Sequence, residues 1–401
     1  MPDLVHTDIF ISGGGVAGLT AAAAFARAGF SVICADPSPP ITDAATEGSD
    51  LRTTAFLQPS RLFLDRAGLW ERLAPHATPL QVMRIVDAGG EAAELRVAHD
   101  FNAADISDLP FGWNLPNWLL SREILAHLAT LPNVDFRPGT GTAHLMTREA
   151  EARVTLSDGS RISAKLVIGA DGRTSPVRAA AGIGVTTLRY GQKALAFAVT
   201  HPVPHENVST EIHRSGGPFT LVPLPDHDGR PCSAVVWMER GPEALRLAAL
   251  PEDAFNAEMT ERSANLFGPL TLVTRRTLWP IISQVADRME AERVALVAEA
   301  AHVVPPIGAQ GLNMSLADMR VLLDLVEAHR ADPGTRELLH KYHRARHAEV
   351  LARVMGVDAL NRASMAEAQG LRDLRLRGLN AIYSVAPVRR VMMRAGLGAT
   401  G

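Results

Sequence analysis

The chain has 401 residues, of which 47% are hydrophobic, so it is long enough to bury a large core and to divide into two lobes. Its 40 basic and 43 acidic residues give a formal net charge of -3 without long runs of either sign, which argues against a nucleic-acid-binding surface. The two cysteines, Cys34 and Cys232, lie far apart and form no disulfide or metal-binding pattern, so we expect a cytoplasmic protein with no metal site.

The first forty residues predict a strand, a glycine-rich turn, a helix and a second strand. "TDIFIS" is typical of a buried strand, "VAGLTAAAAFARAGF" of a helix of small residues, and "SVICAD" of another strand. Such a unit joins parallel strands. We therefore interpret the N-terminus as the first strand of a domain and not as a signal peptide, and no apolar stretch of about 18 residues predicts a membrane span.

The next part of the chain mixes helical and strand-like patterns. Residues 60–73 are predicted to be helical, and "QVMRIVDAGGEAAELRVA" predicts a hairpin that turns at residues 88–90. "SREILAHLATL" is typical of a helix with Ser121 as its N-cap. The alternation in "ARVTLSDGSRISAKLVIGADG" predicts two strands paired around residues 158–159, the second continuing as a buried strand.

Between about residues 193 and 273, strand-like segments such as "ALAFAVT" and "CSAVVWME" dominate, which predicts a second, mostly β lobe. After "RVALVAEAAH" the chain is predicted to be helical again, because apolar residues recur at three- and four-residue spacing. These residues are Leu312, Leu316, Met319, Leu323 and Val326. The sequence therefore predicts an α/β fold with a helical C-terminus.

"GGGVAG" places Gly13, Gly15 and Gly18 between the first strand and its helix. In this arrangement the first glycine permits a tight turn, the second lets the backbone approach a pyrophosphate, and the third lets helix and strand pack closely. Asp36 ends the next strand, where a carboxylate can bind a ribose diol. The pattern predicts dinucleotide binding, while Asp36 alone could also be a solvated strand end.

The nature of the dinucleotide depends on later segments. A simple dehydrogenase would continue with further crossovers, but this chain departs into a β-rich lobe and then returns. "GADGRTSPVR" places Asp171 after a buried strand, with Ser175 and Arg178 at the start of a predicted helix, where phosphate or ribose oxygens can bind.

These motifs together resemble the class A flavoprotein aromatic hydroxylases, and within them the ubiquinone-biosynthesis hydroxylase group. The resemblance covers nearly the whole chain and rests on "GGGVAGL", "DLRTTAFLQPSRLFLDRAGLW", "SREIL", "IGADGRTSPVR", "AEAAHVVPPIGAQGLN" and "APVRRVMMRAGLG". We therefore expect a Rossmann-like FAD-binding domain with an inserted, mostly β substrate domain. The expected ranges are 1–77, 100–190 and 283–345 for the FAD-binding domain, 78–99 and 191–282 for the substrate domain, and 346–401 for a helical C-terminal segment.

The resemblance also implies roles for single residues. It assigns Gly13, Gly15, Gly18 and Asp36 to the ADP half of FAD, Arg52 and Arg122 to its pyrophosphate and ribityl region, and Asp171 to a motif that contacts both FAD and NAD(P)H. Without the family, Arg52 and Arg122 would be interpreted as ordinary surface or helix arginines.

Near residue 300 the family normally has Gly-Asp, whose carboxylate binds the ribityl hydroxyls, but this chain has Ala298 and Glu299. The extra methylene adds about 1.5 Å of reach, so the resemblance still implies a ribityl contact, with a solvated strand end as the alternative. His302 is expected to be a packed, hydrogen-bonded histidine. The loop and helix start after it are assigned to the flavin ring through Pro306, Gly308, Gly311, Leu312 and Asn313.

The implied reaction is hydroxylation of an aromatic ring, expected to be a prenylated phenol of the ubiquinone-precursor type. NAD(P)H would reduce FAD, and O2 would add to it as a C4a-hydroperoxide. The sequence identifies no catalytic base. The alternatives are a flavin-dependent reductase or epoxidase of an isoprenoid, and a non-catalytic flavoprotein scaffold of a quinone-synthesis complex.

The C-terminal tail interleaves apolar and basic residues. They are Leu374, Leu376, Leu379, Ile382 and Val385 with Arg372, Arg375, Arg377, Arg389, Arg390 and Arg394. One interpretation is a packed helix pair with a solvated basic face. The other is a surface that contacts an anionic inner membrane or a biosynthetic complex, where a lipophilic aromatic substrate is found.

Overall fold

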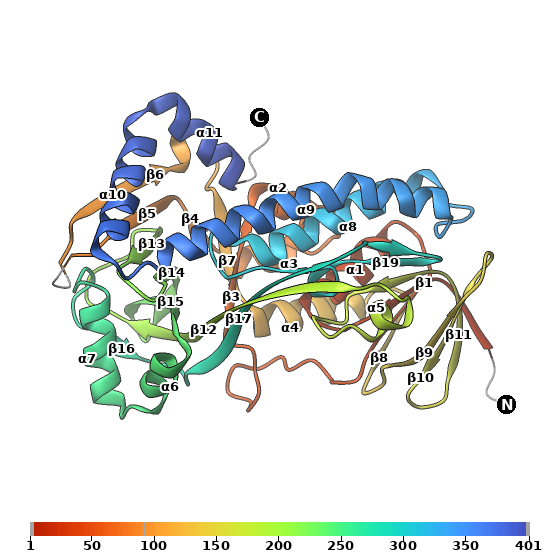
Figure 1. The fold of residues 1–401 in the computed structure, drawn as a ribbon. Helices are drawn as coiled ribbons and strands as arrows, with labels where there is room; N and C mark the ends of the chain where they lie inside the picture. Colours follow the sequence, from red (N-terminus) through yellow and green to blue (C-terminus); the bar gives the residue numbers. More distant parts are fainter. Residues whose placement is uncertain (1–3, 91–93, 398–401) are drawn as a thin grey trace.

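Two large β-sheets organise the protein, whose computed structural model describes residues 4–90 and 94–397 (Figure 1). The first sheet has the strand order β18-β19-β11-β1-β2-β8, and β10 and β9 extend it from β11. Its strands are β1 (Leu4–Ser12), β2 (Val32–Asp36), β8 (Val134–Pro138), β9 (Thr142–Thr147), β10 (Ala152–Leu156), β11 (Arg161–Gly169), β18 (Glu290–Ala291) and β19 (Val294–Leu296). Strands β19, β11, β1, β2 and β8 are parallel, so their C-terminal ends meet at one edge.

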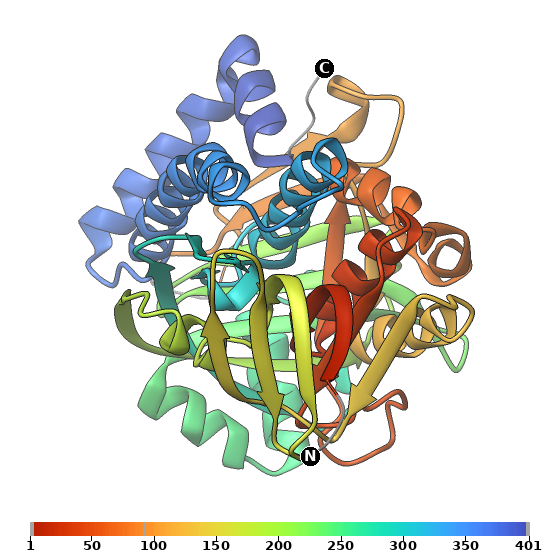
Figure 2. The same ribbon diagram turned by 90° about the vertical axis from the view of Figure 1, so that its right-hand side faces the viewer.

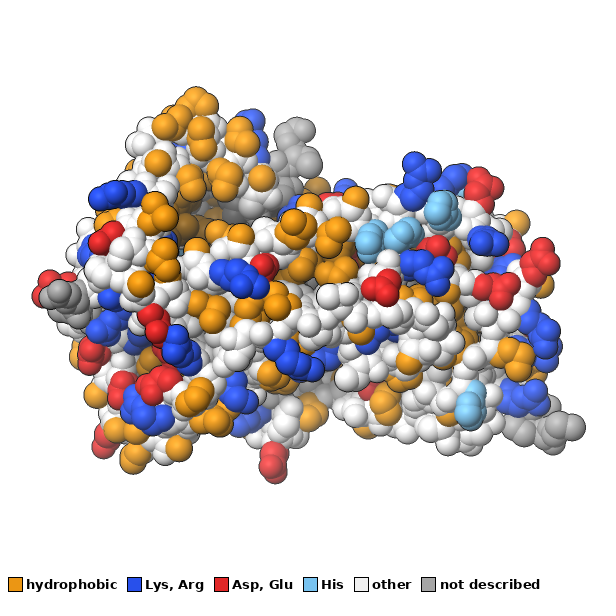
Figure 3. Space-filling model, in the orientation of Figure 1, with side chains coloured by type: hydrophobic (Ala, Val, Ile, Leu, Met, Phe, Trp, Pro, Cys, Tyr) orange, Lys and Arg blue, Asp and Glu red, His pale blue; other side chains and the backbone are white. Residues whose placement is uncertain are grey.

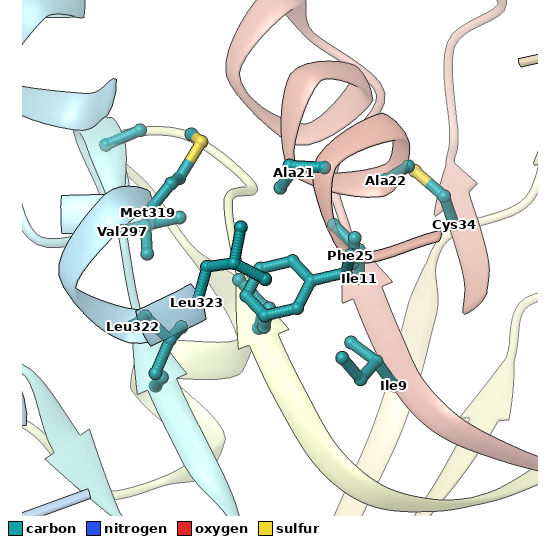
Figure 4. Close-up of a cluster of buried hydrophobic side chains, with 14 of the residues drawn as sticks. Ile9, Ile11, Ala21, Ala22, Phe25, Cys34, Val297, Met319, Leu322 and Leu323 are labelled. Carbon is teal, nitrogen blue, oxygen red and sulfur yellow. The ribbon is translucent and has the colours of Figure 1, made fainter. Parts of the chain in front are cut away.

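Helix α1 (Val16–Arg27) joins β1 to β2 and confirms the predicted strand-turn-helix-strand unit. Its alanine-rich centre is fully buried, because α1 lies between the sheet and helices α4 (Asn117–Leu128) and α8 (Gln310–Ala328). Figure 4 shows buried side chains of β1, α1, β2 and α8 in this core. The labelled residues are Ile9 and Ile11 of β1, Ala21, Ala22 and Phe25 of α1, Cys34 of β2, Val297, and Met319, Leu322 and Leu323 of α8.

The second sheet has the strand order β20-β17-β12-β15-β14-β13-β5-β6, with β16 paired to β12. Its strands are β5 (Val82–Asp87), β6 (Val97–Asn102), β12 (Val185–Thr200), β13 (Val208–His213), β14 (Pro218–His227), β15 (Arg230–Arg240), β16 (Thr271–Leu272), β17 (Thr277–Ala286) and β20 (His302–Val303). The expected β-rich lobe also contains two helices, α6 (Gly241–Ala249) and α7 (Glu252–Arg262), which bury apolar residues against this sheet.

The long strands β12 and β17 form an antiparallel ribbon that joins the two parts of the molecule (Figure 1). The pairing runs from Val185 with Ala286 to Ala196 with Thr277, and its register shifts between Arg189 and Lys193. Gly191 lies inside this irregularity with φ +72°, a conformation that favours glycine.

A third, small sheet has the order β3-β7-β4, formed by β3 (Thr53–Leu57), β4 (Thr78–Leu80) and β7 (Gly112–Pro116). The predicted helical segment 60–73 is observed as α2 (Gln58–Arg66) and α3 (Trp70–Leu73). Short helical turns are η1 (Ala74–His76), η2 (Ala103–Asp105), α5 (Pro176–Ala180) and η3 (Ala298–Ala300).

Both predicted hairpins are present, but one predicted helix cap is wrong. Strand β5 pairs with β6, and β10 pairs with β11 around residues 158–159. Part of the first hairpin's connection, residues 91–93, lies outside the described residues. Ser121 is not an N-cap, because α4 starts directly after strand β7 with Pro116 as its N-cap. The buried residues Leu119 and Leu120 extend the apolar face of α4 before Ser121, which the predicted start overlooked.

The C-terminal part is helical, as predicted, and consists of α8, α9 (Arg336–Ser364), α10 (Gln369–Ser384) and α11 (Ala386–Leu397). Figures 1 and 2 show α8 and α9 running side by side along one face of the molecule. None of the helices in the described part of the chain combines the length and apolar character that a bilayer crossing requires. The domain boundaries given above stay a prediction.

A buried ionic network joins α8 and α9 to the segment that follows β19. Asp318 of α8 is fully buried, and its carboxylate binds His302 Nε2 at 2.6 Å and Arg346 Nε at 2.8 Å. Arg346 also pairs with Glu349 on its own helix. His302 is therefore a packed, hydrogen-bonded residue as expected, and its partner is Asp318.

Replacing Arg346 with methionine should lower the free energy of unfolding by about 3–5 kcal/mol, because it removes the cation that compensates a fully buried carboxylate. Arg362→Met, on an exposed part of the same helix, is the control and should have little effect. Denaturant titration measures both. Equal midpoints for the two variants would show that the buried network contributes no more than a surface pair.

Candidate active site

Four predicted site residues lie at the C-terminal ends of four neighbouring parallel strands. Gly13 follows β1, Asp36 ends β2, Asp171 follows β11, and Glu299 follows β19. Neighbouring strands lie about 4.8 Å apart, so these residues form a row across the C-terminal edge of the sheet. We call this row the strand-end site. Open α/β sheets bind extended ligands at this edge.

The glycine loop at the strand-end site is fixed by close backbone packing. Gly13 has φ +116°, and a Cβ on it would lie 2.3 Å from the carbonyl oxygen of Ala170. A Cβ on Gly18 would lie 1.9 Å from the carbonyl oxygen of Gly13. A Cβ on Gly15 would meet no atom within 4 Å, so this part of the loop faces open space. Gly13 and Gly18 are thus required by the fold, whereas Gly15 leaves room for a ligand.

The N-terminus of α1 is open to an anion. Gly15 is its N-cap, no side chain caps it, and its first turn contains no acidic residue. Its free N–H groups are therefore available, and helix N-termini favour negative charge. Beside them, the half-buried Asp36 accepts hydrogen bonds from Gly14 N at 2.6 Å and Ser38 N at 2.8 Å. Asp36 is therefore anchored against the glycine loop.

Asp171 carries a carboxyl oxygen without a partner. Its Oδ2 accepts hydrogen bonds from Ser12 Oγ at 3.2 Å and Val177 N at 3.0 Å. Its Oδ1 is buried and has no hydrogen-bond partner among the described residues. Burial raises the pKa of Asp171, although these hydrogen bonds oppose the shift. A buried oxygen in this state is suited to a ligand hydroxyl.

Arg178 does not have the phosphate-binding role that the sequence suggested for it. Ser175 lies at the start of a helix, as predicted, and the structure shows that it caps this helix, α5, by accepting a hydrogen bond from Arg178 N. The Arg178 guanidinium, however, is buried and donates to the carbonyl oxygens of Ala300 at 2.8 Å and Arg173 at 2.7 Å. Arg178 therefore ties the segment after β11 to the segment after β19.

Glu299 is exposed while its neighbours Ala298 and Ala300 are buried, so its carboxylate projects from the strand-end site. Ala298 has φ +55°, a left-handed conformation that favours glycine. The change from the family's Gly-Asp to Ala-Glu therefore leaves the acid in place but strains the residue before it.

Arg52 lies near Glu299. Its guanidinium forms an ion pair with Asp50 at 2.7 Å and lies 4.1 Å from the ring centre of Trp279. Burial opposes its charge, but the hydrogen bond and charge of Asp50 and the charge of Glu299 together raise the pKa of Arg52. The structure thus brings Arg52 to the Glu299 side of the site.

Arg122 lies on the surface of α4, and its ion-pair partner is on the same helix. It is exposed on α4, where it pairs with Glu123 at 2.9 Å and lies 5.3 Å from the ring centre of Trp118. Within the described ranges it forms no hydrogen bond or ion pair with another predicted site residue.

The loop before α8 also leaves backbone exposed. Gly308 and Ala309 both have positive φ, +63° and +55°, and Ala309 is the N-cap of α8 without a side-chain cap. Pro306 and Gly311 are exposed, and a Cβ on Gly311 would meet no atom within 4 Å. The helix therefore presents free N–H groups to open space, as a flavin ring would require.

Leu312 and Asn313 lie in the first turn of α8 and mainly hold it in place. Leu312 packs against the main core. The Asn313 side chain accepts from Leu57 N at 2.9 Å and donates to the carbonyl oxygens of Ala55 at 2.7 Å and Ala309 at 2.6 Å. Asn313 therefore fastens α8 to strand β3, so any contact that it makes with a ligand would come from its backbone.

Sequence reasoning missed Gln310, which links three parts of the chain. Its side chain donates to the carbonyl oxygens of Gly308 at 2.8 Å and Gly396 of α11 at 3.2 Å, and accepts from Arg353 of α9 at 3.0 Å. No local pattern signals these partners, because they lie up to 86 residues away.

The residues present fit an FAD molecule. Gly15 and Gly311 leave open approaches, the N-termini of α1 and α8 offer uncapped N–H groups, and Asp171 and Glu299 offer oxygens along the same edge.

Comparison with known proteins decides the family. Residues 6–356 match a family model described as an FAD binding domain. The chain belongs to this family. Ubiquinone hydroxylase UbiL of Rhodospirillum rubrum is 36% identical over 396 residues, which cover 98% of this chain and 89% of UbiL. The 3-demethoxyubiquinol 3-hydroxylase of Escherichia coli is 26% identical, with 98% of each chain covered.

A solved structure shows the same fold. The p-nitrophenol 4-monooxygenase PnpA from Pseudomonas putida DLL-E4 superposes with a TM-score of 0.79 at 19% identity, covering 99% of this chain and 100% of PnpA. The predicted resemblance is therefore confirmed: the protein is an FAD-dependent flavoprotein monooxygenase of the ubiquinone-biosynthesis hydroxylase group.

Gly15→Ala should weaken FAD binding, because the added methyl group would occupy the open approach to the loop, while the stability of the flavin-free protein should change by less than about 1 kcal/mol. Gly18→Ala is the matched comparison and should lower the free energy of unfolding by about 1–3 kcal/mol through overpacking. FAD titration and thermal unfolding separate the two effects. Unchanged FAD affinity in Gly15→Ala would remove Gly15 from the binding surface.

Ala298→Gly should raise the free energy of unfolding by about 1 kcal/mol, because glycine adopts the left-handed conformation without strain. Ala300→Gly, two residues further in the same turn and without a positive φ, should lower it by about 1 kcal/mol. Thermal unfolding of the flavin-free variants measures both. Destabilisation by both substitutions would show that the Ala298 conformation carries no strain.

Proposed function

We propose that the protein hydroxylates a prenylated phenol of the ubiquinone-precursor type, using FAD, NAD(P)H and O2. The observation that carries the proposal is the row of Gly13, Asp36, Asp171 and Glu299 across one sheet edge, whose last turn, η3, contacts α8, a helix with an uncapped start. The substrate class is supported by the relatives named above, two of which are called ubiquinone or demethoxyubiquinol hydroxylases.

Within this proposal, each part of the strand-end site has one task. The glycine loop and Asp36 hold the ADP half of FAD, Arg52 and Arg122 face its central region, and Asp171 and Glu299 bind its hydroxyls. The residues Pro306, Gly308, Gly311, Leu312 and Asn313 shape the flavin-ring end. The predicted division into an FAD-binding domain, a β-rich substrate domain and a helical C-terminal segment is part of the same proposal.

When bound, FAD supplies the redox chemistry, accepting two electrons from NAD(P)H and activating O2. The chain's own contribution is to orient the cofactor and exclude water. The N–H groups at the start of α8 would stabilise negative charge on the reduced ring by about 0.3–1 kcal/mol. Asn313 holds this helix start against β3, so the N–H groups keep their direction.

An apolar cluster beside the helix start suits a lipophilic aromatic substrate. Its buried members are Leu57, Leu80, Phe101, Ala103, Phe111 and Met393. We call it the apolar cluster. Because Leu57 N donates to the Asn313 side chain, the cluster is linked directly to the first turn of α8. Such surroundings would exclude water from the ring end of the site.

The proposal is tested by purifying the protein and assaying it with a prenylated phenol. We expect a yellow protein that oxidises NAD(P)H faster when the phenol is present and transfers one atom of isotope-labelled O2 to the ring. Glu299→Ala should retain less FAD than the wild type, whereas Met146→Ala, an exposed substitution on β9, should retain as much.

The alternative functions predict different results. A reductase or epoxidase of an isoprenoid would leave the aromatic ring unlabelled. A non-catalytic scaffold would bind FAD without phenol-stimulated NAD(P)H oxidation. A preparation that cannot be loaded with FAD would contradict the proposal as a whole.

A further inference from the structure

Helices α10 and α11 form a hairpin over residues 369–397, which we call the C-terminal hairpin. Its inner side contributes to the apolar cluster. Met393 is 4% exposed within the cluster, and Leu379 and Tyr383 pack against it. Tyr383 also stacks on His99 with 3.9 Å between ring centres and meets the ring of Phe101 edge-on. The hairpin is therefore the cover of the apolar cluster on this side.

Three of its six arginines attach the hairpin to the body of the protein. Arg375 forms an ion pair at 3.0 Å with Asp87, a fully buried carboxylate of β5. Arg372 donates to the carbonyl oxygen of Gly90, and Arg389 lies over the ring of Tyr383 and 3.5 Å from Asp105. Half of the arginines of the hairpin therefore hold it against the body of the protein.

The other three arginines face outward with a group of apolar side chains. Arg377, Arg390 and Arg394 are exposed, and the described residues provide no ion-pair partner for them. The apolar residues are Leu371 at 56% exposed, Leu374 at 63%, Val385 at 48%, Val388 at 45%, Val391 at 64% and Met392 at 50%. Figure 3 shows hydrophobic side chains gathered over α10 and α11 at the upper left, with basic side chains beside them. We call this surface the outer face of the hairpin.

The positive charge of the hairpin indicates what kind of partner its outer face can bind. Residues 369–397 contain six arginines and one acid, Asp373, which is paired with Arg96 at 2.8 Å. The whole chain has a net charge of -3, so the hairpin is a positive segment of a chain that is negative overall. Two copies meeting through this face would bring like charges together. A surface that combines exposed apolar residues with unpaired arginines is instead complementary to anionic lipid.

We propose that the outer face of the C-terminal hairpin docks on an anionic lipid bilayer. Its apolar residues would enter the interface, and Arg377, Arg390 and Arg394 would contact lipid headgroups. The inner side of the same hairpin covers the apolar cluster, and Gly396 contacts Gln310 at the start of α8. A prenylated substrate would therefore pass from the bilayer into the cluster beneath the hairpin, a step that rests on the function proposed above.

The docking is tested by floating the full-length, FAD-loaded protein with vesicles. One set contains phosphatidylcholine alone, and the other an equimolar mixture with phosphatidylglycerol. We expect flotation with the anionic vesicles. Arg390→Gln combined with Arg394→Gln should weaken binding roughly fivefold for each charge removed, and so roughly 25-fold for the pair. Val388→Asp combined with Val391→Asp should also prevent flotation.

Matched controls lie away from the hairpin. Arg148→Gln combined with Arg288→Gln removes the same charge from two other exposed positions, and Leu62→Asp changes an exposed leucine of α2. These variants should float like the wild type. Circular dichroism and unchanged NAD(P)H oxidation with a short-chain phenol in solution show that the hairpin variants remain folded.

Failure of the docking and failure of the proposed function give different results. A wild-type protein that does not float, or floats equally with both vesicle types, overturns the docking, even if it hydroxylates a soluble phenol. Equal losses in the hairpin and control variants overturn it as well. Charge-dependent flotation by a protein without hydroxylase activity supports the docking and contradicts the proposed function.

Discussion

The parallel pairing of β2, β1, β11 and β19 is the constraint on which the candidate site depends. Residues that are up to 286 positions apart in sequence, from Gly13 to Glu299, reach one sheet edge because parallel strands all end on the same side. The glycine loop fits there only because Gly13 and Gly18 lack a Cβ. Any change that shifted this register would displace all of these site residues relative to one another.

The remaining part of the site is held by contacts from the C-terminal third of the chain. Asp318 binds His302 on one side and Arg346 on the other, and so positions the segment after β19 against α8 and α9. Asn313 joins α8 to β3 in the same way. The helix start that faces the proposed flavin ring is therefore fixed from both sides, and its N–H groups need little reorganisation on binding.

The sequence predicted the parts of this site that are encoded locally. The glycine spacing, the strand ending at Asp36 and the helix start at Ser175 depend on near neighbours, and each has the predicted local structure. Glu299 could be singled out only through the family resemblance, because an acid after a strand is common. The pairing of Arg178 with Ala300 and the contacts of Gln310 could not be predicted, since nothing near either residue signals its distant partner. Ser121 failed as a cap because the helical pattern starts four residues earlier.

The ribbon of β12 and β17 has a mechanical consequence. It is hydrogen-bonded on both sides of one irregularity, between Arg189 and Lys193, and it joins the two parts of the molecule. A rigid rocking of one part against the other would have to bend this ladder, and Gly191 is the place where bending is least opposed. The ladder therefore opposes relative motion of the two parts, so we expect small molecules to reach the interior through local displacement of loops and helices and not through a wide opening between the lobes.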